Sequence, residues 1–336
     1  MKEKEKKEIF DVTIIGGGTT GLFAAFYCGM RGLTTKVLEG SSFLGGKVAQ
    51  FYPEKNIYDV GGLPVVSGTD LVEQMKKQAV LHDPEILLNQ YVEAIQQVEG
   101  KGFEITTQQG DAHYSKTILL TTGFGTYNPV PLEHKDAKEF EETSIHYMMG
   151  DLRRFKDKHV AIYSNQRAGV DWALSLGEVA KHVYLFCTEE QFQHVVEADL
   201  EKVQQSKNID LVYDATIGEL QGERGSLNGI TIISKGASSS YSVDDMLVYQ
   251  GVKMIPAPFS DWQLEAEKGR LIVDQGMATS VPGIFAAGDG VQYDKKSMLI
   301  ATGYSEVITA LNSLAKYIDP KAPAQVYSTV EYRYKK

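Results

Sequence analysis

Residues 11–39 carry an apolar strand, a glycine-rich turn, a helix and a second strand, in an order that few folds accommodate. Residues 11–15 (DVTII) are apolar or β-branched without alternation, which is typical of a buried parallel strand. Gly16, Gly18 and Gly21 then fit the pattern GxGxxG, and small apolar residues follow. The next strand, at 34–38, ends at Glu39. This order predicts a strand–turn–helix–strand unit that binds a dinucleotide.

Each position in the turn has a physical role. Gly16 makes the tight turn, Gly18 lets the backbone approach a pyrophosphate, and Gly21 lets the helix pack closely on the strand. The pyrophosphate meets free N–H groups at the start of the helix, where Thr20 lies. We expect Glu39 to accept hydrogen bonds from both ribose hydroxyls of an adenosine.

Length and charge narrow the class further. The chain has 336 residues, enough for about two domains. Its net charge of −10 argues against nucleic-acid binding. It lacks an apolar run of about 18 residues and a signal-peptide core, so we expect a cytoplasmic protein without a membrane partner. Cys28 and Cys187 form no CxxC pair, which argues against a metal site and a dithiol redox centre.

The residues after Glu39 indicate which dinucleotide binds. They read GGK at 45–47 and QFYPEK at 50–55, followed by YD at 58–59. This pattern resembles the ferredoxin (or flavodoxin)–NADP reductases built on the thioredoxin-reductase plan, where a GGQ turn precedes YPEK and YD. The resemblance implies FAD as the cofactor, with Tyr52 stacked on one face of the isoalloxazine ring. Lys47 replaces the family's glutamine, an amide, by a cation that can only donate.

The same resemblance implies further FAD contacts. Val92 matches a backbone contact to adenine, and Phe124, in the linker motif LLTTGFG at 119–125, lies near the flavin. The string VPGIFAAGD at 281–289 matches the second FAD fingerprint, in which Gly288 and Asp289 bind the ribityl or phosphate end. The sequence LIATGYSE at 299–306 opens a helix whose N-terminus points at the pyrimidine side of the flavin.

The C-terminal residues VYST, at 326–329, resemble an extension that the family has and thioredoxin reductases lack. In the family an aromatic residue or histidine there covers the other flavin face, commonly across a dimer interface. Tyr327 holds that place, and Thr329 is expected near the polar edge of the flavin. A homodimer is therefore predicted.

The middle of the chain repeats the strand–turn–helix–strand pattern, but it lacks the residues that would contact the phosphates of a nucleotide. The turn between the strand at 159–163 and the helix at 168–180 reads SNQRAG, where the family has GGGDSA. Gln166 stands where the backbone must touch a pyrophosphate. Cys187, Thr188 and Glu189 replace the His-Arg-Arg that clamps the 2′-phosphate of NADPH. These changes predict weakened NADPH use, and an acid at this place favours NADH, since carboxylates bind a free ribose.

We therefore predict an α/β fold of two Rossmann-like, three-layer dinucleotide-binding domains. Residues 1–125 and 277–336 form a discontinuous FAD domain, and residues 126–276 an inserted NAD(P)H-binding-like domain. One hypothesis is an FAD-dependent reductase that passes electrons between a pyridine nucleotide and ferredoxin or flavodoxin, with weakened or altered NADPH use. The other is a diverged FAD protein without NAD(P)H chemistry, acting as a redox-responsive regulator or taking electrons from a protein partner. Neither requires a catalytic side chain, because the flavin carries the chemistry.

Overall fold

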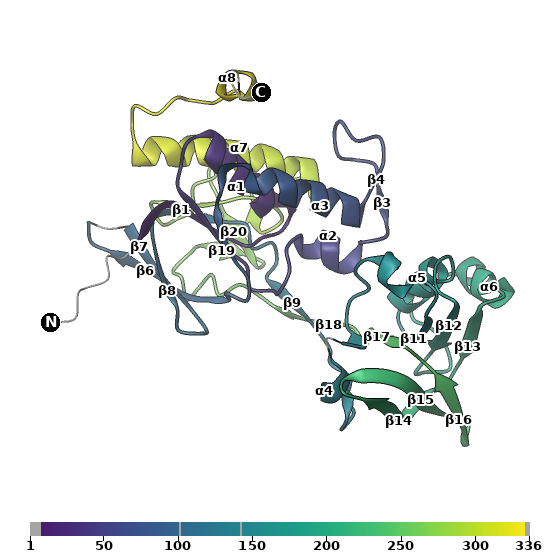
Figure 1. Cartoon of the computed structure of the whole chain (residues 1–336). Coiled ribbons are helices and arrows are strands. Elements are labelled where there is room, and N and C mark those ends of the chain that lie inside the picture. The colour runs from purple at the N-terminus through teal and green to yellow at the C-terminus, as the bar shows by residue number, and fades with distance from the viewer. Residues whose placement is uncertain (1–7, 101, 142, 333–336) are drawn as a thin grey trace. The chain divides into compact units, whose positions relative to one another are not determined.

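The computed structural model describes residues 8–100, 102–141 and 143–332. The chain forms two compact units (Figure 1). Unit 1 consists of residues 1–126 and 254–336, and unit 2 of residues 127–253. Unit 2 is thus an insertion in unit 1, and each unit has a sheet and a core of its own.

The central sheet of unit 1 has seven strands, in the order β5-β2-β1-β8-β7-β6, with β21 paired to β8. Strands β5, β2, β1, β8 and β21 are parallel neighbours, whereas β6, β7 and β8 form an antiparallel meander. The bounds are β1 (Ile9–Ile15), β2 (Thr35–Leu38), β5 (Glu85–Leu87), β6 (Val92–Val98), β7 (Gly102–Thr107), β8 (Ala112–Leu120) and β21 (Ile284–Ala286). Val12, Ile14 and Val37 are fully buried, as expected for parallel strands covered on both faces.

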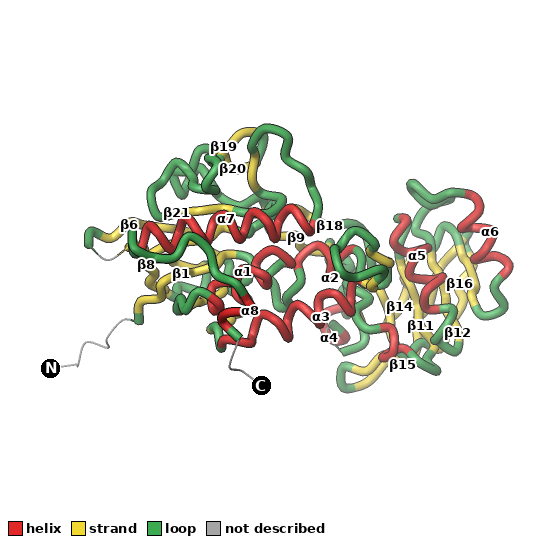
Figure 2. Tube along the Cα trace, turned by 90° about the horizontal axis from the view of Figure 1, so that it is seen from above, coloured by secondary structure: helices red, strands yellow, loops and turns green. Residues whose placement is uncertain are grey.

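Helices pack along this sheet. The first crossover, from β1 to β2, runs through α1 (Thr19–Met30), which contacts both α3 (Gly68–Ala79) and α7 (Ile300–Ile318). Figure 2 shows these three helices side by side. The shorter elements are α2 (Gly46–Phe51), η1 (Val80–His82), α8 (Ser328–Glu331), β3 (Asn56–Ile57), β4 (Val66–Ser67), β19 (Ala266–Glu267), β20 (Arg270–Ile272) and β22 (Val291–Gln292).

The second boundary between the units lies earlier than the sequence suggested. The chain returns to unit 1 at Met254, whereas the sequence-based boundary was placed at residue 277. Phe259 and Trp262 are buried in the core of unit 1, and the Trp262 indole Nε1 donates to the Glu93 carbonyl at 3.1 Å. Because these large aromatic side chains are buried in the core of unit 1, the segment 254–276 packs as part of unit 1.

Unit 2 contains a parallel five-stranded sheet in the order β10-β17-β11-β12-β13 and an antiparallel sheet in the order β14-β15-β16. The strands of the parallel sheet are β10 (Ile145–His146), β11 (His159–Tyr163), β12 (His182–Phe186), β13 (Ile209–Val212) and β17 (Asp245–Val248). The remaining elements are β14 (Thr216–Glu223), β15 (Ser226–Ser234), β16 (Ala237–Ser242), α4 (Ala137–Phe140), η2 (Leu152–Phe155), α5 (Arg167–Leu176) and α6 (Glu197–Gln205). The connecting strands β9 (Thr126–Pro129) and β18 (Val252–Ile255) pair with each other.

The two units repeat one topology, which allows positions to be matched between them. In unit 1, the Gly16 N–H after β1 donates to the carbonyl of Leu38, the last residue of β2, at 2.8 Å. In unit 2, the Ser164 N–H after β11 donates to the carbonyl of Phe186, the last residue of β12, at 3.0 Å. Gly16 and Ser164 are therefore equivalent, and so are the turns that follow them.

Among the described residues, no helix combines the length and the apolar character needed to cross a lipid bilayer.

Candidate functional site

The turn after β1 places two of its glycines where the protein itself forbids a side chain. Gly16 has a φ of +108°, and a Cβ on it would lie 2.5 Å from the Thr121 carbonyl oxygen. A Cβ on Gly21 would lie 1.9 Å from the Gly16 carbonyl oxygen. These two glycines shape the turn and let α1 approach β1 closely.

Gly18 is different, because no protein atom demands a glycine there. Its φ is −69° and its ψ is −175°, a conformation open to any residue. The nearest atom to a Cβ on Gly18 would be the Gly46 Cα, at 3.8 Å, which is an ordinary contact. The space before the N-terminus of α1 is thus left clear by the protein, as an approaching pyrophosphate requires.

The carboxylate of Glu39 is fixed at the carboxyl end of β2. Its two oxygens accept hydrogen bonds from the backbone N–H groups of Gly17, at 2.6 Å, and Ser41, at 2.7 Å. The Gln90 N–H donates to the Glu39 carbonyl at 2.8 Å, which brings the start of β6 beside this end of the sheet. Val92 there is 4% exposed with its side chain in the core, so a contact from it to adenine would come from the backbone.

The C-terminal segment meets the turn through Thr20. Strand β21 pairs with β8, so Ala286 lies beside Leu120 and residues 287–289 emerge at the same edge as the glycine turn. A Cβ on Gly288 would lie 2.9 Å from the Thr20 hydroxyl oxygen, and one on Gly303 would lie 2.7 Å from it. The start of α7 and the 288–289 turn therefore close on the first turn of α1.

Lys47 connects α2 to the second fingerprint. Its Nζ lies 2.7 Å from the Asp289 Oδ2, and the two side chains are about one-third exposed. The same Nζ lies 4.6 Å from the ring centroid of Phe124, and the Arg270 guanidinium carbon lies 5.1 Å from that centroid. The predicted residues Lys47, Phe124 and Asp289 are thus brought together, and Arg270 joins them, although sequence reasoning did not single it out.

A buried ionic network behind this turn was also missed. The Glu306 carboxylate, 4% exposed, accepts from the Gly288 N–H at 2.7 Å and from the Tyr293 hydroxyl at 2.6 Å, and pairs with Lys296, 3% exposed. Burial and then the nearby Glu306 charge raise the pKa of Tyr293 to about 12. A carboxylate on the buried face of an otherwise apolar helix was the available sequence signal.

Tyr52, at the end of α2, is 49% exposed in the chain alone. Large aromatic side chains gain free energy from covering their faces, and this ring has much of its surface available to a stacking partner. Its position is compatible with the predicted role at one flavin face.

The C-terminal tail lies at the other end of α1. The Tyr332 hydroxyl lies 2.5 Å from His82 Nε2, and Arg31, just after α1, donates to the Pro323 carbonyl at 2.7 Å. The twelve residues of α1 span roughly 18 Å at 1.5 Å per residue, so this anchor is remote from the glycine turn. Tyr327 and Thr329 precede Tyr332 by only a few residues, so the structure does not bring them to the site within one chain (Figure 1).

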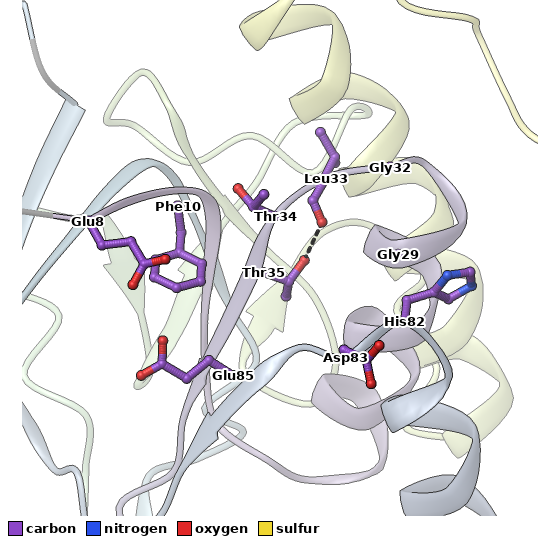
Figure 3. Close-up of a pocket in the computed structure, with 10 residues that line it drawn as sticks. All are labelled: Glu8, Phe10, Gly29, Gly32, Leu33, Thr34, Thr35, His82, Asp83 and Glu85. Carbon is purple, nitrogen blue, oxygen red and sulfur yellow. Dashed lines mark hydrogen bonds between the residues drawn. The ribbon is translucent and has the colours of Figure 1, made fainter.

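A pocket of about 450 Å³ lies at the opposite edge of the sheet from the glycine turn. It is formed at the amino ends of β1, β2 and β5, where Phe10, Thr35 and Glu85 line it, together with residues after α1 and η1 (Figure 3). The Thr35 hydroxyl donates to the Leu33 carbonyl at 2.9 Å across its wall. Its place at the amino ends of the strands separates it from the predicted FAD contacts.

The turn of unit 2 differs from the turn of unit 1 at two polar positions. Cys187, the residue after β12, occupies the position that Glu39 holds in unit 1, and it is fully buried. Arg167, at the start of α5, is paired with Asp199 at 3.2 Å and with Asp171 at 3.5 Å. The ribose acceptor is therefore replaced by a thiol, and the cation of the turn is engaged by carboxylates of its own unit.

Two topologically repeated units, with an open glycine turn in the first, define a protein built to bind dinucleotides. The chain belongs to the pyridine nucleotide-disulphide oxidoreductase family, whose model matches residues 10–313. Within it, the chain is similar to ferredoxin–NADP reductases. It is 39% identical to ferredoxin–NADP reductase 1 of Bacillus velezensis, covering 97% of both chains. It is 40% identical to ferredoxin–NADP reductase 2 of Shouchella clausii, covering 96% of this chain and 97% of the relative.

Solved structures show the same fold. Thioredoxin reductase from T. acidophilum matches with a TM-score of 0.60 and 25% identity, covering 94% of this chain and 99% of that one. Lactococcus lactis thioredoxin reductase in its FR conformation also has a TM-score of 0.60, at 23% identity, over 92% of this chain and 99% of that one. The predicted two-unit α/β fold and the predicted resemblance are confirmed.

Proposed function

We propose that this chain is an FAD-dependent oxidoreductase of the ferredoxin–NADP reductase type. It passes electrons between a pyridine nucleotide and ferredoxin or flavodoxin through FAD, with weakened or altered NADPH use. The observation that carries the proposal is the open space at Gly18, next to the Gly17 N–H that donates to the Glu39 carboxylate. The similarity to proteins named ferredoxin–NADP reductase supports it.

We propose separate contacts for the pyrophosphate, the ribose, the adenine and the flavin of FAD. The pyrophosphate is held by backbone N–H groups at the start of α1, where the helix dipole favours negative charge. The ribose is held by the Glu39 carboxylate and the adenine by the backbone at Val92. The turn residues are Gly16, Gly18, Thr20 and Gly21. The residues on the flavin side are Lys47, Tyr52, Phe124, Gly288 and Asp289.

The protein's part in the reaction is to bind and position. Bound FAD supplies the redox chemistry, since a flavin can take up an electron pair and release single electrons. Asp289 and Lys47 fix the turn at the flavin side by their ion pair. The exposed ring of Tyr52 covers one flavin face and keeps water from it.

A homodimer completes the proposal. Tyr327 and Thr329 lie beyond the far end of α1 from their own glycine turn, so they would cover a flavin only from a second copy of the chain. Sedimentation of the FAD-loaded protein at micromolar concentration tests this, with an expected mass of two chains. A single-chain mass under those conditions would contradict the homodimer.

The closed turn of unit 2 favours a second candidate function. A diverged FAD protein could lack hydride transfer from NAD(P)H altogether, and act as a redox-responsive regulator or take electrons from a protein partner. The loss of the ribose acceptor at Cys187 and the engagement of Arg167 by Asp199 both favour it.

Anaerobic stopped-flow absorbance of the flavin band tests both candidates. The reductase proposal expects the band to bleach after mixing with NADPH or NADH, and the reduced flavin to be reoxidised by added ferredoxin or flavodoxin. If neither NADPH nor NADH bleaches the flavin band, while dithionite and a reduced ferredoxin still do, the reductase proposal is contradicted. That result would support the second candidate. If the purified chain contains no FAD and does not bind added FAD, both candidate functions are contradicted.

A further inference from the structure

The two units of this chain share the geometry of the turn in more detail than their strand order. In unit 1, Gly18 forms an isolated parallel bridge with Gly45, and the Gly45 N–H donates to the Gly17 carbonyl at 2.8 Å. In unit 2, Gln166 forms an isolated parallel bridge with Gln193. The Gln193 N–H donates to the Asn165 carbonyl, also at 2.8 Å. The loop that crosses the turn therefore makes the same bridge and the same backbone hydrogen bond in both units.

Matching these bridges pairs four glycines of unit 1 with four residues of unit 2 that carry side chains. The pairs are Gly17 with Asn165, Gly18 with Gln166, Gly45 with Gln193, and Gly46 with His194. Even the left-handed backbone is kept at the last pair, where φ is +54° in Gly46 and +58° in His194. Unit 2 thus keeps the bridge and the last left-handed residue of the first turn, but it carries side chains where unit 1 has glycines. Gly16 and Gly45 have a φ of +108°, and their counterparts Ser164 and Gln193 lie outside the left-handed region.

The new side chains bind one another across the turn. The Gln166 Nε2 donates to the Gln193 Oε1 at 3.1 Å and to the Asn165 Oδ1 at 3.1 Å. The Gln193 Nε2 lies 3.3 Å from the Glu189 Oε1, which also accepts from the Asn165 Nδ2. We name Asn165, Gln166, Glu189 and Gln193 the amide latch. The backbone N–H of Gln166 also has a partner within the turn, because it donates to the Ser164 hydroxyl at 3.0 Å.

The rest of the unit 2 turn keeps its structural role. A Cβ on Gly169, the counterpart of Gly21, would lie 2.6 Å from the Ser164 Cβ, so this glycine is still needed for packing α5 on β11. Glycine is thus retained at this packing position, whereas Gln166 replaces the glycine whose counterpart, Gly18, faces open space. The replacement also adds the negative charge of Glu189, which repels a phosphate.

We infer that the amide latch closes the nucleotide turn of unit 2 and sets the low affinity of this protein for pyridine dinucleotides. The inference rests on the proposed function, because it explains how a reductase of this type has weakened NADPH use. Binding a pyrophosphate in the manner of unit 1 would displace the Gln166 side chain and break the hydrogen bonds of the latch. The latch is therefore the residue set that determines the affinity of unit 2 for pyridine dinucleotides.

Calorimetric titration of the FAD-loaded protein with NADPH, and separately with NADH, tests the latch. The opened variant carries Asn165→Gly and Gln166→Gly, which gives unit 2 the glycines that unit 1 has at Gly17 and Gly18. We expect it to bind at least one of the two nucleotides about tenfold or more tighter than the wild type, because the steric block and three side-chain hydrogen bonds are removed. Gln193→Ala keeps the turn backbone intact and removes one partner, so a few-fold tightening is expected.

Gln204→Ala is the matched control, because Gln204 is an exposed glutamine on α6 outside the latch, and it should leave both affinities unchanged. Equal affinities in wild type, the opened variant and Gln193→Ala would overturn the inference, as would tight nucleotide binding by the wild type. If the melting temperature shows that the opened variant misfolds, the nucleotide affinity of Gln193→Ala, compared with that of the wild type, decides whether the inference holds. FAD content and bleaching by dithionite are measured on the same samples. Their loss would contradict the proposed function without affecting the latch, whose titration is then repeated on the FAD-free chain.

Discussion

Replacing Gly18 by alanine is expected to weaken FAD binding about 10- to 100-fold while leaving the fold intact. The added methyl group meets no protein atom closer than 3.8 Å, and the φ of −69° suits alanine, so folding carries no penalty. The same methyl group would project into the space proposed for the pyrophosphate, where inserting a methylene-sized group into a close contact costs about 1–3 kcal/mol. Fluorescence titration of the FAD-free chain with FAD measures the affinity, and thermal melting of that chain measures stability.

Gly21→Ala provides the contrasting variant. Its Cβ would lie 1.9 Å from the Gly16 carbonyl oxygen, a backbone atom that cannot move away cheaply, so the FAD-free chain should lose about 2 kcal/mol or more of stability. The two neighbouring glycines are thereby separated into one required by the ligand and one required by the fold. If Gly18→Ala retained wild-type FAD affinity, or destabilised the FAD-free chain as Gly21→Ala does, the proposed pyrophosphate site would be ruled out.

The second large effect is expected at the buried ion pair behind the Gly288–Asp289 turn. Lys296→Met removes the cation and leaves the Glu306 carboxylate, 4% exposed, without its charge partner. Removing one partner of a buried pair typically costs about 3–5 kcal/mol. Because Glu306 also holds the Gly288 N–H, the variant should bind FAD more weakly as well as unfold earlier.

Urea unfolding monitored by tryptophan fluorescence measures this effect within unit 1. The chain has two tryptophans, and Trp262 is buried in unit 1 whereas Trp172 is buried in unit 2. A Trp172→Phe background therefore isolates the signal of the unit that contains the ion pair. The double variant Lys296→Met/Glu306→Gln carries no unpaired charge and should be about 2 kcal/mol more stable than Lys296→Met alone. Strictly additive effects of the two substitutions would show that the pair is not coupled.

Most of the fold could be predicted because its signals are local. The apolar strand at 11–15, the glycine spacing and the acid at Glu39 lie within one stretch of chain, and each is dictated by backbone geometry. The family resemblance was carried by strings such as VPGIFAAGD at 281–289, and the similarity to the relatives confirms it. The predicted boundary at residue 277 lies later than the observed return at Met254, because the apolar residues scattered through 259–273 are compatible with packing on either unit. The burial of Phe259 and Trp262 in the core of unit 1 and the hydrogen bond from Trp262 to the Glu93 carbonyl decide which.

The site was predictable only in part, for a different reason. The cofactor contacts expected from motifs at Gly18, Glu39 and Asp289 are proposals that the geometry supports. The Glu306–Lys296 network depends on burial, which sequence spacing does not reveal, and Arg270 reaches Phe124 from a segment that had been assigned to the other unit. The tail is expected over a flavin face, commonly across a dimer interface, and this stays a prediction, since the Tyr332–His82 contact holds the tail beyond the end of α1 of its own chain.

The pairing of β9 with β18 has a consequence for how such a chain can change over time. Residues 127–253 leave unit 1 and re-enter it through two neighbouring strands, whose backbones lie about 5 Å apart. An insertion joined at adjacent points behaves as a detachable module, because the host strands need only a short connection to close. Substitutions in the second turn can therefore change the unit that contains them without disturbing the first turn. A chain reduced to unit 1 by a short loop between Thr126 and Met254 should still fold around its own core.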